Sequence, residues 1–261
     1  MATTRVQGAR GTGTSSIAVT LGSTPSNGNA LIACVCMCGS GGASVSSISQ
    51  TNVTWTKQTS KAYSTSSSTS EIWFGVVSAS ASTSITFNLS NVNTGYYQIA
   101  DVYEYSGVAV SSFLDKTASS AALSSSPNTG TTAATTQNDE LWIGATAVTS
   151  GGYGANVAQS SPTNSFTLLD GANTDKSITA HSSLGFLEKI VSSTGTANTD
   201  TTIPSSQQWA GCIATFKASS TSTYKPETRT NLASTVTTML NSKMFFSVCN
   251  RFPKLIVNNL I

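Results

Sequence analysis

Residues able to carry chemistry are few in this chain of 261 residues. His181 is the only histidine and therefore the one conceivable imidazole base. No Gly-x-Ser-x-Gly elbow surrounds any serine, and His181 lies in the Ser/Thr-rich stretch 179–183, so we expect it to be a loop residue. Asp101 and Glu104 are three positions apart on a predicted strand, on opposite faces, and cannot flank one scissile bond. Glu104 is expected to be a structural acceptor beside the turn at 106–107, and we predict no catalytic residue and no enzyme.

Metal and phosphate sites are also poorly marked. Three stretches rich in Asp and Asn could supply oxygen ligands for calcium: 138–140, 170–175 and 198–200. They lack the Asp-x-Asp-x-Asp-Gly spacing of a calcium loop, so solvated turns are the favoured interpretation. Gly151–Gly154 is not followed by Lys-Ser/Thr and is predicted to be a hairpin tip rather than a phosphate loop. No metal and no cofactor is predicted.

Aromatic residues offer a different chemistry, because exposed indoles stack on sugar rings. The chain has four tryptophans, Trp55, Trp73, Trp142 and Trp209, and each sits within an apolar run. Core packing is therefore the favoured interpretation of the group. Trp55 and Tyr153 are the aromatic residues that we expect to be exposed, and they are the candidate glycan contacts.

Three cysteines alternate along one strand-like run, at Cys34, Cys36 and Cys38. Their side chains share one face in steps of about 6.5 Å, too far apart for an unstrained disulfide between neighbours. They also cannot converge on one tetrahedral metal. We expect them to act as small hydrophobes in a buried strand and in a reducing compartment. Cys212 and Cys249 leave open the alternative of a disulfide, such as a Cys212 bridge across the core.

The strand signals that must position these residues occur twice, about 110 residues apart. The matching segments are Leu31–Ala33 with Leu141–Ile143, Trp73–Ser78 with Leu187–Ser192, and Ala100–Tyr105 with Gly211–Phe216. Each set covers one face of a core, which predicts an all-β fold: a two-sheet antiparallel β-sandwich with an internal pseudo-twofold duplication. The sandwich is expected over residues 1–217, with halves at about 13–107 and 139–217 joined by a Ser/Ala/Thr-rich connection.

Composition and charge exclude several function classes. Only 9% of residues are charged and 38% are hydrophobic, so solubility must come from hydroxyl and amide groups. Residues 1–217 carry 8 Lys and Arg against 10 Asp and Glu, whereas residues 218–261 carry 5 against 1. These cations are too dispersed for nucleic-acid binding. The sequence contains no stretch that predicts a membrane span or a secretory signal, so we expect synthesis in a cytoplasm.

The C-terminal residues differ from the duplicated region. Residues 218–226 are predicted to be a linker, and residues 227–261 a helical or extended arm. An apolar stripe at helical spacing is followed by further large apolar residues, and the candidate assembly residues are Leu232, Val236, Met239, Leu240, Phe245, Phe246 and Phe252. Such a surface needs burial, so we expect it to contact another subunit, with folding back onto its own sandwich as the alternative.

Several short motifs occur in an order that carries a resemblance. They are Asn29–Ile32, Val45–Ser49, Thr54–Thr56, Glu71–Phe74 and Glu104–Gly107, followed by Leu114-Asp115, Asn138-Asp139 and Phe166–Leu168. Over about residues 13–217 the chain resembles a widespread β-sandwich module of bacterial and archaeal surface proteins and of structural proteins of their viruses. The resemblance implies a jelly-roll-like or lectin-like sandwich in an extracellular or virion setting. It carries no catalytic residues.

The expected function is a non-enzymatic structural protein of a virion: a capsid decoration, capsid shell or tail-fibre subunit. Its expected partners are copies of itself or other virion proteins, and its location is the virion after synthesis in the host cytoplasm. The alternative is a carbohydrate-binding or adhesion module on an extracellular surface, with a host surface glycan as ligand. Low charge favours the first function, because closely packed like subunits cannot each carry a large net charge.

Overall fold

The computed structural model describes residues 2–64, 68–150, 156–174 and 181–220. Their regular structure is entirely β. The strands are β1 (Thr4–Gly13), β2 (Ser16–Thr20), β3 (Ala30–Ser49), β4 (Val53–Ala62), β5 (Ser68–Val77), β6 (Ser84–Val92), β7 (Gln98–Ser106), β8 (Leu114–Ser124), β9 (Asp139–Ser150), β10 (Thr167–Asp170), β11 (Asn173–Thr174), β12 (His181–Ser192) and β13 (Gln207–Lys217). Within these described ranges no helix is long and apolar enough to cross a membrane.

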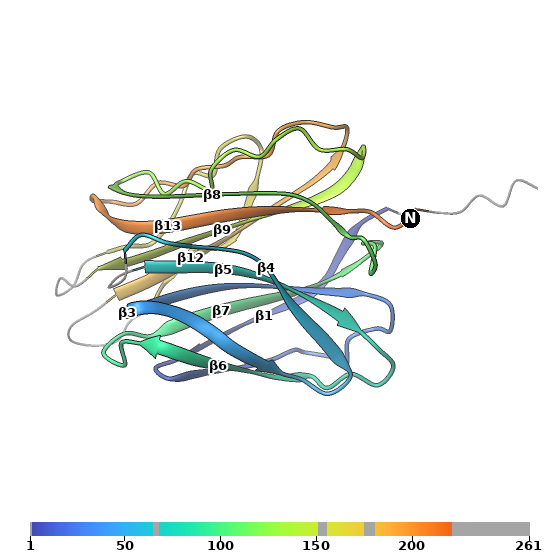
Figure 1. Ribbon diagram of the computed structural model, residues 1–261, viewed down its shortest axis with the longest axis horizontal. Helices are drawn as coiled ribbons and strands as arrows, with labels where there is room; N and C mark the ends of the chain where they lie inside the picture. The colour runs from blue at the N-terminus through green and yellow to red at the C-terminus, as the bar shows by residue number, and fades with distance from the viewer. Residues whose placement is uncertain (1, 65–67, 151–155, 175–180, 221–261) are drawn as a thin grey trace, which may run out of the picture. The chain divides into compact units, whose positions relative to one another are not determined.

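Two antiparallel sheets are packed together, as Figure 1 shows. The first sheet has the strand order β1-β7-β3-β5-β4, with β2 and β6 attached, and the second has the order β10-β12-β9-β13-β8, with β11 attached. In Figure 1, β8, β13, β9 and β12 form the upper layer, and β5, β3, β7 and β1 lie beneath them. The all-β, two-sheet antiparallel sandwich predicted from the sequence is confirmed.

The duplication appears in the strand order. Strands β1, β7, β3, β5 and β4 of the first sheet correspond in order to β8, β13, β9, β12 and β10 of the second. Each half of the chain therefore builds one sheet around a central strand, β3 or β9. Leu31 and Leu141 lie in these equivalent central strands, as predicted.

The residue-by-residue match of the central strands differs from the prediction. Leu31 pairs with Glu104 in the first sheet, and Trp142 pairs with Thr215 in the second. Because Glu104 and Thr215 are equivalent in the repeat, Leu31 corresponds to Trp142, and its predicted match with Leu141 is wrong by one residue. A shift of one residue turns a side chain to the other face of a strand. Both strands are apolar on both faces, so their hydrophobic pattern could not determine the register.

Two strands extend beyond what the sequence predicted, β8 as an additional strand and β3 as a longer one. Strand β8 lies within the stretch that was expected to be a connection. The sequence did not predict this strand because its Ser, Ala and Thr residues are small and only partly buried. Strand β3 continues through Gly39–Gly42, although a run so rich in glycine is typical of a turn. Gly42 has a φ of 89°, a conformation that suits glycine, and beyond it β3 pairs with β6 instead of β5 and β7.

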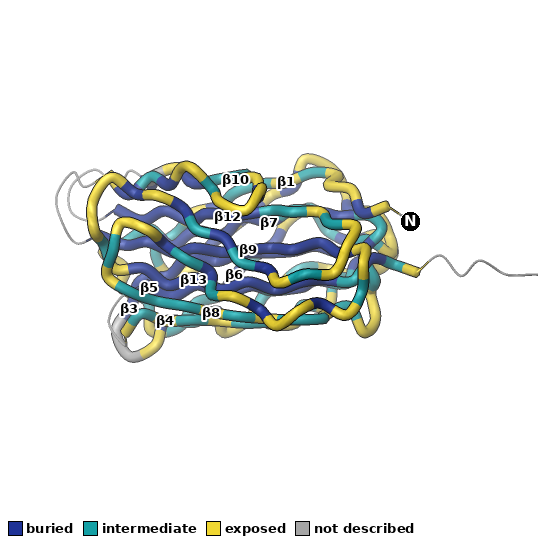
Figure 2. The backbone as a smooth tube through the Cα atoms, turned by 90° about the horizontal axis from the view of Figure 1, so that it is seen from above, coloured by how far each residue is buried: buried dark blue, intermediate teal, exposed yellow. Residues whose placement is uncertain are grey.

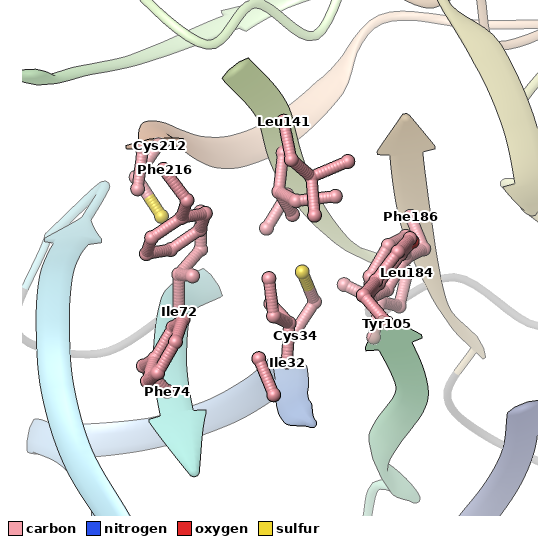
Figure 3. Close-up of a cluster of buried hydrophobic side chains, with 14 of the residues drawn as sticks. Ile32, Cys34, Ile72, Phe74, Tyr105, Leu141, Leu184, Phe186, Cys212 and Phe216 are labelled. Atoms are coloured by element: carbon pink, nitrogen blue, oxygen red, sulfur yellow. The ribbon is translucent and has the colours of Figure 1, made fainter. Parts of the chain in front are cut away.

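The central core lies between the two sheets (Figure 3). Alternate residues of the central strands belong to it, Ile32 and Cys34 from β3 and Ile143 and Ala145 from β9. Figure 3 shows Ile72, Phe74 and Tyr105 of the first sheet opposite Leu184, Phe186, Cys212 and Phe216 of the second. Burial of each large side chain contributes about 1.5–3 kcal/mol to stability.

A second core covers the outer face of the first sheet. Leu31, Ala33 and Val35 of β3 pack there against Ile85 and Phe87 of β6, with residues of β2 and the end of β3. In Figure 1, β6 lies below the first sheet, as a further layer. In Figure 2, β9 and β12 are buried along most of their length, whereas β4 and β8 are only partly buried. The burial of β3 on both faces explains why it is apolar throughout.

Residues 125–138, here called the cover segment, lie over the outer face of the second sheet. Three buried threonines spaced three residues apart, Thr129, Thr132 and Thr135, pair with Thr199, Ala197 and Gly195. In each pair the threonine N–H donates to the partner carbonyl, at 3.1, 3.0 and 2.9 Å. Each threonine hydroxyl oxygen accepts the partner N–H in return, at 3.1, 2.9 and 3.1 Å. The cover segment is thus hydrogen-bonded to residues 195–199 although it contains no regular strand.

Directional polar contacts join the two sheets. Tyr105 Oη donates to Glu188 Oε2 at 2.7 Å, and Arg5 Nη1 lies 3.2 Å from Glu188 Oε1. The buried hydroxyls of Ser68 and Thr149 are 2.7 Å apart across the sheets. Because such bonds depend on geometry, they fix the position of one sheet over the other.

Candidate functional site

Two tryptophans form a partly exposed face on the outer side of β4 and β5, here called the Trp55–Trp73 face. Trp55 lies opposite Gly75, and Lys57 lies opposite Trp73. Gly75 makes room for the indole, because a Cβ atom there would lie 3.0 Å from Trp55 Cδ2. Both rings also border the second core, where the Trp55 ring centroid is 6.2 Å from that of Phe87.

Glu71 holds the polar part of this face. Its carboxylate is buried, accepts a hydrogen bond from Trp73 Nε1 at 2.7 Å and pairs with Lys57 Nζ at 3.0 Å. The Lys57 ammonium also lies 5.4 Å from the centroid of the Trp73 ring. Trp55 Nε1 donates to Gln50 Oε1 at 3.1 Å. The two half-buried indoles are therefore held in fixed orientations beside a cation whose side chain is 38% exposed.

The tryptophans divide into two pairs. Trp142 and Trp209 are buried, as core packing predicted. Trp55, the predicted glycan contact, is half-buried. Its neighbour Trp73, which the sequence assigned to the core, is half-buried as well. Tyr153, the other predicted contact, and Gly151–Gly154 lie outside the described residues.

His181 is not the loop residue predicted from the sequence. It is the first residue of β12, where it pairs with Ser150 and is buried, and its Nδ1 atom has no hydrogen-bond partner among the described residues. The Ser/Thr composition around it suggested a loop because hydroxyl side chains are common in turns, yet Ser182 and Ser183 are buried in the strand.

Asp101 and Glu104 lie on opposite sides of β7, as predicted. Asp101 faces the central core region, whereas Glu104 binds the turn before β3. Glu104 accepts hydrogen bonds from Ser26 N at 2.8 Å, Asn29 Nδ2 at 2.7 Å and Gln7 Nε2 at 2.6 Å. Its structural role agrees with the prediction, but its partners are not in the turn at 106–107.

One pair of carboxyl groups escaped the sequence analysis. Asp115 on β8 and Glu140 on β9 belong to the strands on either side of β13. Burial raises the pKa of Glu140 to about 7, and Asp115 adds to the rise. Both side chains are almost completely buried, so no substrate reaches between them. The Glu-x-Trp spacing is a signal that could have found one member, because Trp142 Nε1 donates to Glu140 Oε2 at 2.9 Å, as Trp73 does to Glu71.

The acidic stretches considered for calcium make protein contacts instead. Asp170 pairs with Arg10 Nη1, and Asp200 Oδ1 accepts a hydrogen bond from Asn128 Nδ2. No group of three or more His, Cys, Asp or Glu side chains in the described residues is arranged to hold a metal ion. Asp170 and Asp200 therefore bind neighbouring segments of the chain.

The cysteines are free thiols in buried positions. Cys34 and Cys36 fill the central core, as predicted, and Cys212 lies in the same core without a disulfide. Burial raises the pKa of the Cys212 thiol to about 12, against the lowering effect of its hydrogen bond with Ser70. Cys249 lies outside the described residues.

An open cavity of about 960 Å³ lies beside the first residues of β9 and the last of β12. It is lined by Thr3, by residues 136–140 and 190–192 and by Ala218. Trp55 is the one predicted glycan or assembly residue within the described part of the chain, and it does not line this cavity.

The chain's relationships to other proteins give no further identification. Neither a protein-family model, nor a curated protein, nor a solved structure matches it.

Proposed function

We propose that this chain is a non-enzymatic structural protein of a virion, in which the sandwich is a rigid exposed body and residues 227–261 mediate assembly. The observation that carries the proposal is that residues 2–220 complete their own cores. Among the described residues, five large hydrophobic residues are exposed, and they are scattered over several elements: Val6, Val110, Leu114, Leu123 and Ile190. The cores of the described sandwich are therefore closed by its own residues.

The C-terminal region is rich in large apolar residues. Leu232, Val236, Met239, Leu240, Phe245, Phe246 and Phe252 lie outside the described residues, and their assembly role follows from their spacing and hydrophobicity alone. Each large side chain left in water forgoes about 1.5–3 kcal/mol of burial free energy. A neighbouring copy or another virion protein is the proposed partner, and the virion is the proposed location.

A truncation tests this proposal. The sandwich ends later than the predicted linker start, because Ala218 is buried and Ser219 N donates to Gly107 O at 2.8 Å. The stop should therefore follow Ser220 and not Lys217. We expect the truncated protein to remain folded and monomeric while the full chain assembles, as measured by light scattering after gel filtration. A full chain that stays monomeric at all concentrations would contradict the proposal.

Carbohydrate binding is the second candidate function, and the Trp55–Trp73 face favours it. Indole faces stack on the apolar faces of sugar rings, while a fixed lysine can donate hydrogen bonds to hydroxyl or carboxylate oxygens. A glycan array probed with the full chain tests this function. Trp55→Ala and Lys57→Ala should abolish any signal, and Leu123→Ala, at an exposed position on β8, should retain it. Signals that survive both face variants would exclude this face.

A further inference from the structure

The open cavity of about 960 Å³ beside β9 and β12 lies where the described part of the chain ends. Its lining includes Thr3 near the start of the chain, Gln137 from the cover segment, and Ser220, the last described residue. Residues 221–261 therefore follow directly from a residue of the lining. A hollow of this kind is a surface on which side chains of a partner can be withdrawn from water.

Hydrogen bonds hold the walls of this cavity together. Gln137 Nε2 donates to the carbonyl oxygens of Asp139 and Ala218, at 2.7 and 3.1 Å. Ala218 N donates to Asp139 O at 3.0 Å, and Ser219 N donates to Gly107 O at 2.8 Å. Because these bonds join the start of β9 to residues 218–219, the cavity is formed by the folded sandwich itself and needs no ligand to shape it.

Ile190 gives the cavity an apolar contact surface. It lies on β12, lines the cavity and is 47% exposed, which makes it one of the exposed large hydrophobic residues of the described chain. The next residue of the lining, Val191, is partly buried against the neighbouring core residues. A large apolar side chain of a partner can therefore be buried against Ile190.

The charged residues in the lining are acidic. Asp139 is exposed and Glu140 is buried, and no lysine or arginine of the described chain lines the cavity. The adjacent Lys217 is paired with Asp115 on β8, at 3.9 Å. Residues 221–261 carry 5 Lys and Arg against 1 Asp or Glu, together with the apolar residues proposed for assembly. The C-terminal residues are thus complementary to the cavity in charge and in hydrophobicity.

We propose that this cavity receives residues 227–261 of a neighbouring copy, with an apolar side chain against Ile190 and a cation near Asp139. This docking rests on the proposed assembly role of those residues and names the surface that they bind. Every copy carries both the cavity and the C-terminal residues, so two copies can exchange these residues reciprocally or successive copies can be joined head to tail. Docking within one copy would instead occupy the cavity in a monomer.

A disulfide cross-link in the full chain tests this docking. Ser192 is exposed and lines the cavity, so Ser192→Cys places a thiol there, while Cys249 lies within residues 227–261. The other cysteines are buried in the sandwich: Cys34, Cys36, Cys38 and Cys212. Mild oxidation of Ser192→Cys should give covalent dimers and larger species on a non-reducing gel, and adding Cys249→Ser should abolish them. Ser49→Cys, exposed on β3 outside the lining, is the matched control and should give none.

A second pair of variants tests the contact without a cross-link. Asp139→Lys with Ile190→Ser reverses the charge and removes the apolar contact, so the full chain should lose its assemblies on gel filtration. Leu123→Ser, at an exposed position on β8, removes a comparable apolar side chain outside the cavity and should leave assembly unchanged.

The outcomes separate this docking from the assembly role on which it rests. A full chain that assembles without cross-links dependent on Cys249, or that assembles normally with both cavity substitutions, would overturn the docking and leave the assembly role standing. An internal disulfide between Cys249 and the thiol introduced by Ser192→Cys in monomers would overturn it as well, because the C-terminal residues would then bind their own copy. A full chain that never assembles would contradict the proposed function and this docking together.

Discussion

Arg10 lies close to Asp101 but does not form a hydrogen bond with its carboxyl group. Arg10 Nε lies 3.7 Å from Asp101 Oδ1, yet neither carboxyl oxygen of Asp101 has a hydrogen-bond partner among the described residues. Arg10 instead lies 2.5 Å from Asp170 Oδ1 and donates to the carbonyl of Ala172 at 3.2 Å. Asp101 is 1% exposed, and burial raises its pKa to about 8, against the lowering effect of Arg10 and with Asp170 adding to the rise. Burial without a hydrogen-bond partner therefore favours the protonated form of Asp101 in the folded protein.

Asp101→Asn should stabilise the protein at neutral and alkaline pH. The folded pKa of Asp101 lies above the ordinary value of 3.8, so the folded state loses stability as the pH rises from about 4 to about 8. The variant removes this loss and should be more stable by about 2–5 kcal/mol at pH 8, with little difference at pH 4. Urea unfolding at both pH values measures the effect. Equal stability of the two proteins at pH 8 would show that Asp101 is ionised without penalty.

The threonine pairing of the cover segment predicts that substitutions of the neighbours Thr132 and Thr131 change the stability of the protein to different extents. Thr132→Val keeps the shape of the side chain but removes the oxygen that accepts the Ala197 N–H, leaving a buried donor unpaired. The expected cost is about 1–3 kcal/mol in the free energy of unfolding. Thr131→Val is the matched control, because Thr131 is exposed, and it should change stability by less than about 0.5 kcal/mol. Thermal or denaturant unfolding that fails to separate the two variants would contradict this role.

The buried cysteines should resist thiol reagents in the folded protein. Burial raises the pKa of Cys38 to about 11, and it raises those of Cys34 and Cys36 more strongly. Because the thiolate is the reactive form, Cys34, Cys36, Cys38 and Cys212 should be labelled only after unfolding. Peptide mass spectrometry after alkylation with and without denaturant measures each site separately. Rapid native labelling of Cys34 or Cys212 would mean that the central core opens readily.

Much of the fold could be predicted from the sequence because its strands are short, β-branched and repeated in order. Strand β8 could not, since its Ser and Ala residues are as typical of a linker as of a partly buried edge strand. The residue-by-residue match of β3 with its counterpart β9 was predicted wrongly for a different reason, because both strands are apolar on each face. Hydrophobic alternation defines register only where one face meets water.

The candidate sites were harder to predict. Trp55 was identified as accessible, but Trp73 sits in an apolar run and its partial exposure depends on β4 being the edge strand. Asp115 and Glu140 are separated along the chain and belong to strands on either side of β13. Only the pairing of both strands with β13 brings them together, and no local spacing in the sequence records it.

We propose that the described sandwich is self-contained and that the C-terminal apolar residues drive assembly. Sedimentation velocity of the full chain with Phe245, Phe246 and Phe252 replaced by serine tests it most directly. We predict that the unsubstituted chain sediments as assemblies and the substituted chain as a folded monomer with the same thermal unfolding midpoint, because the cores of the described sandwich are built from residues within 2–220. Assemblies that survive the triple substitution, or a substituted chain that unfolds at a lower temperature, would contradict the account.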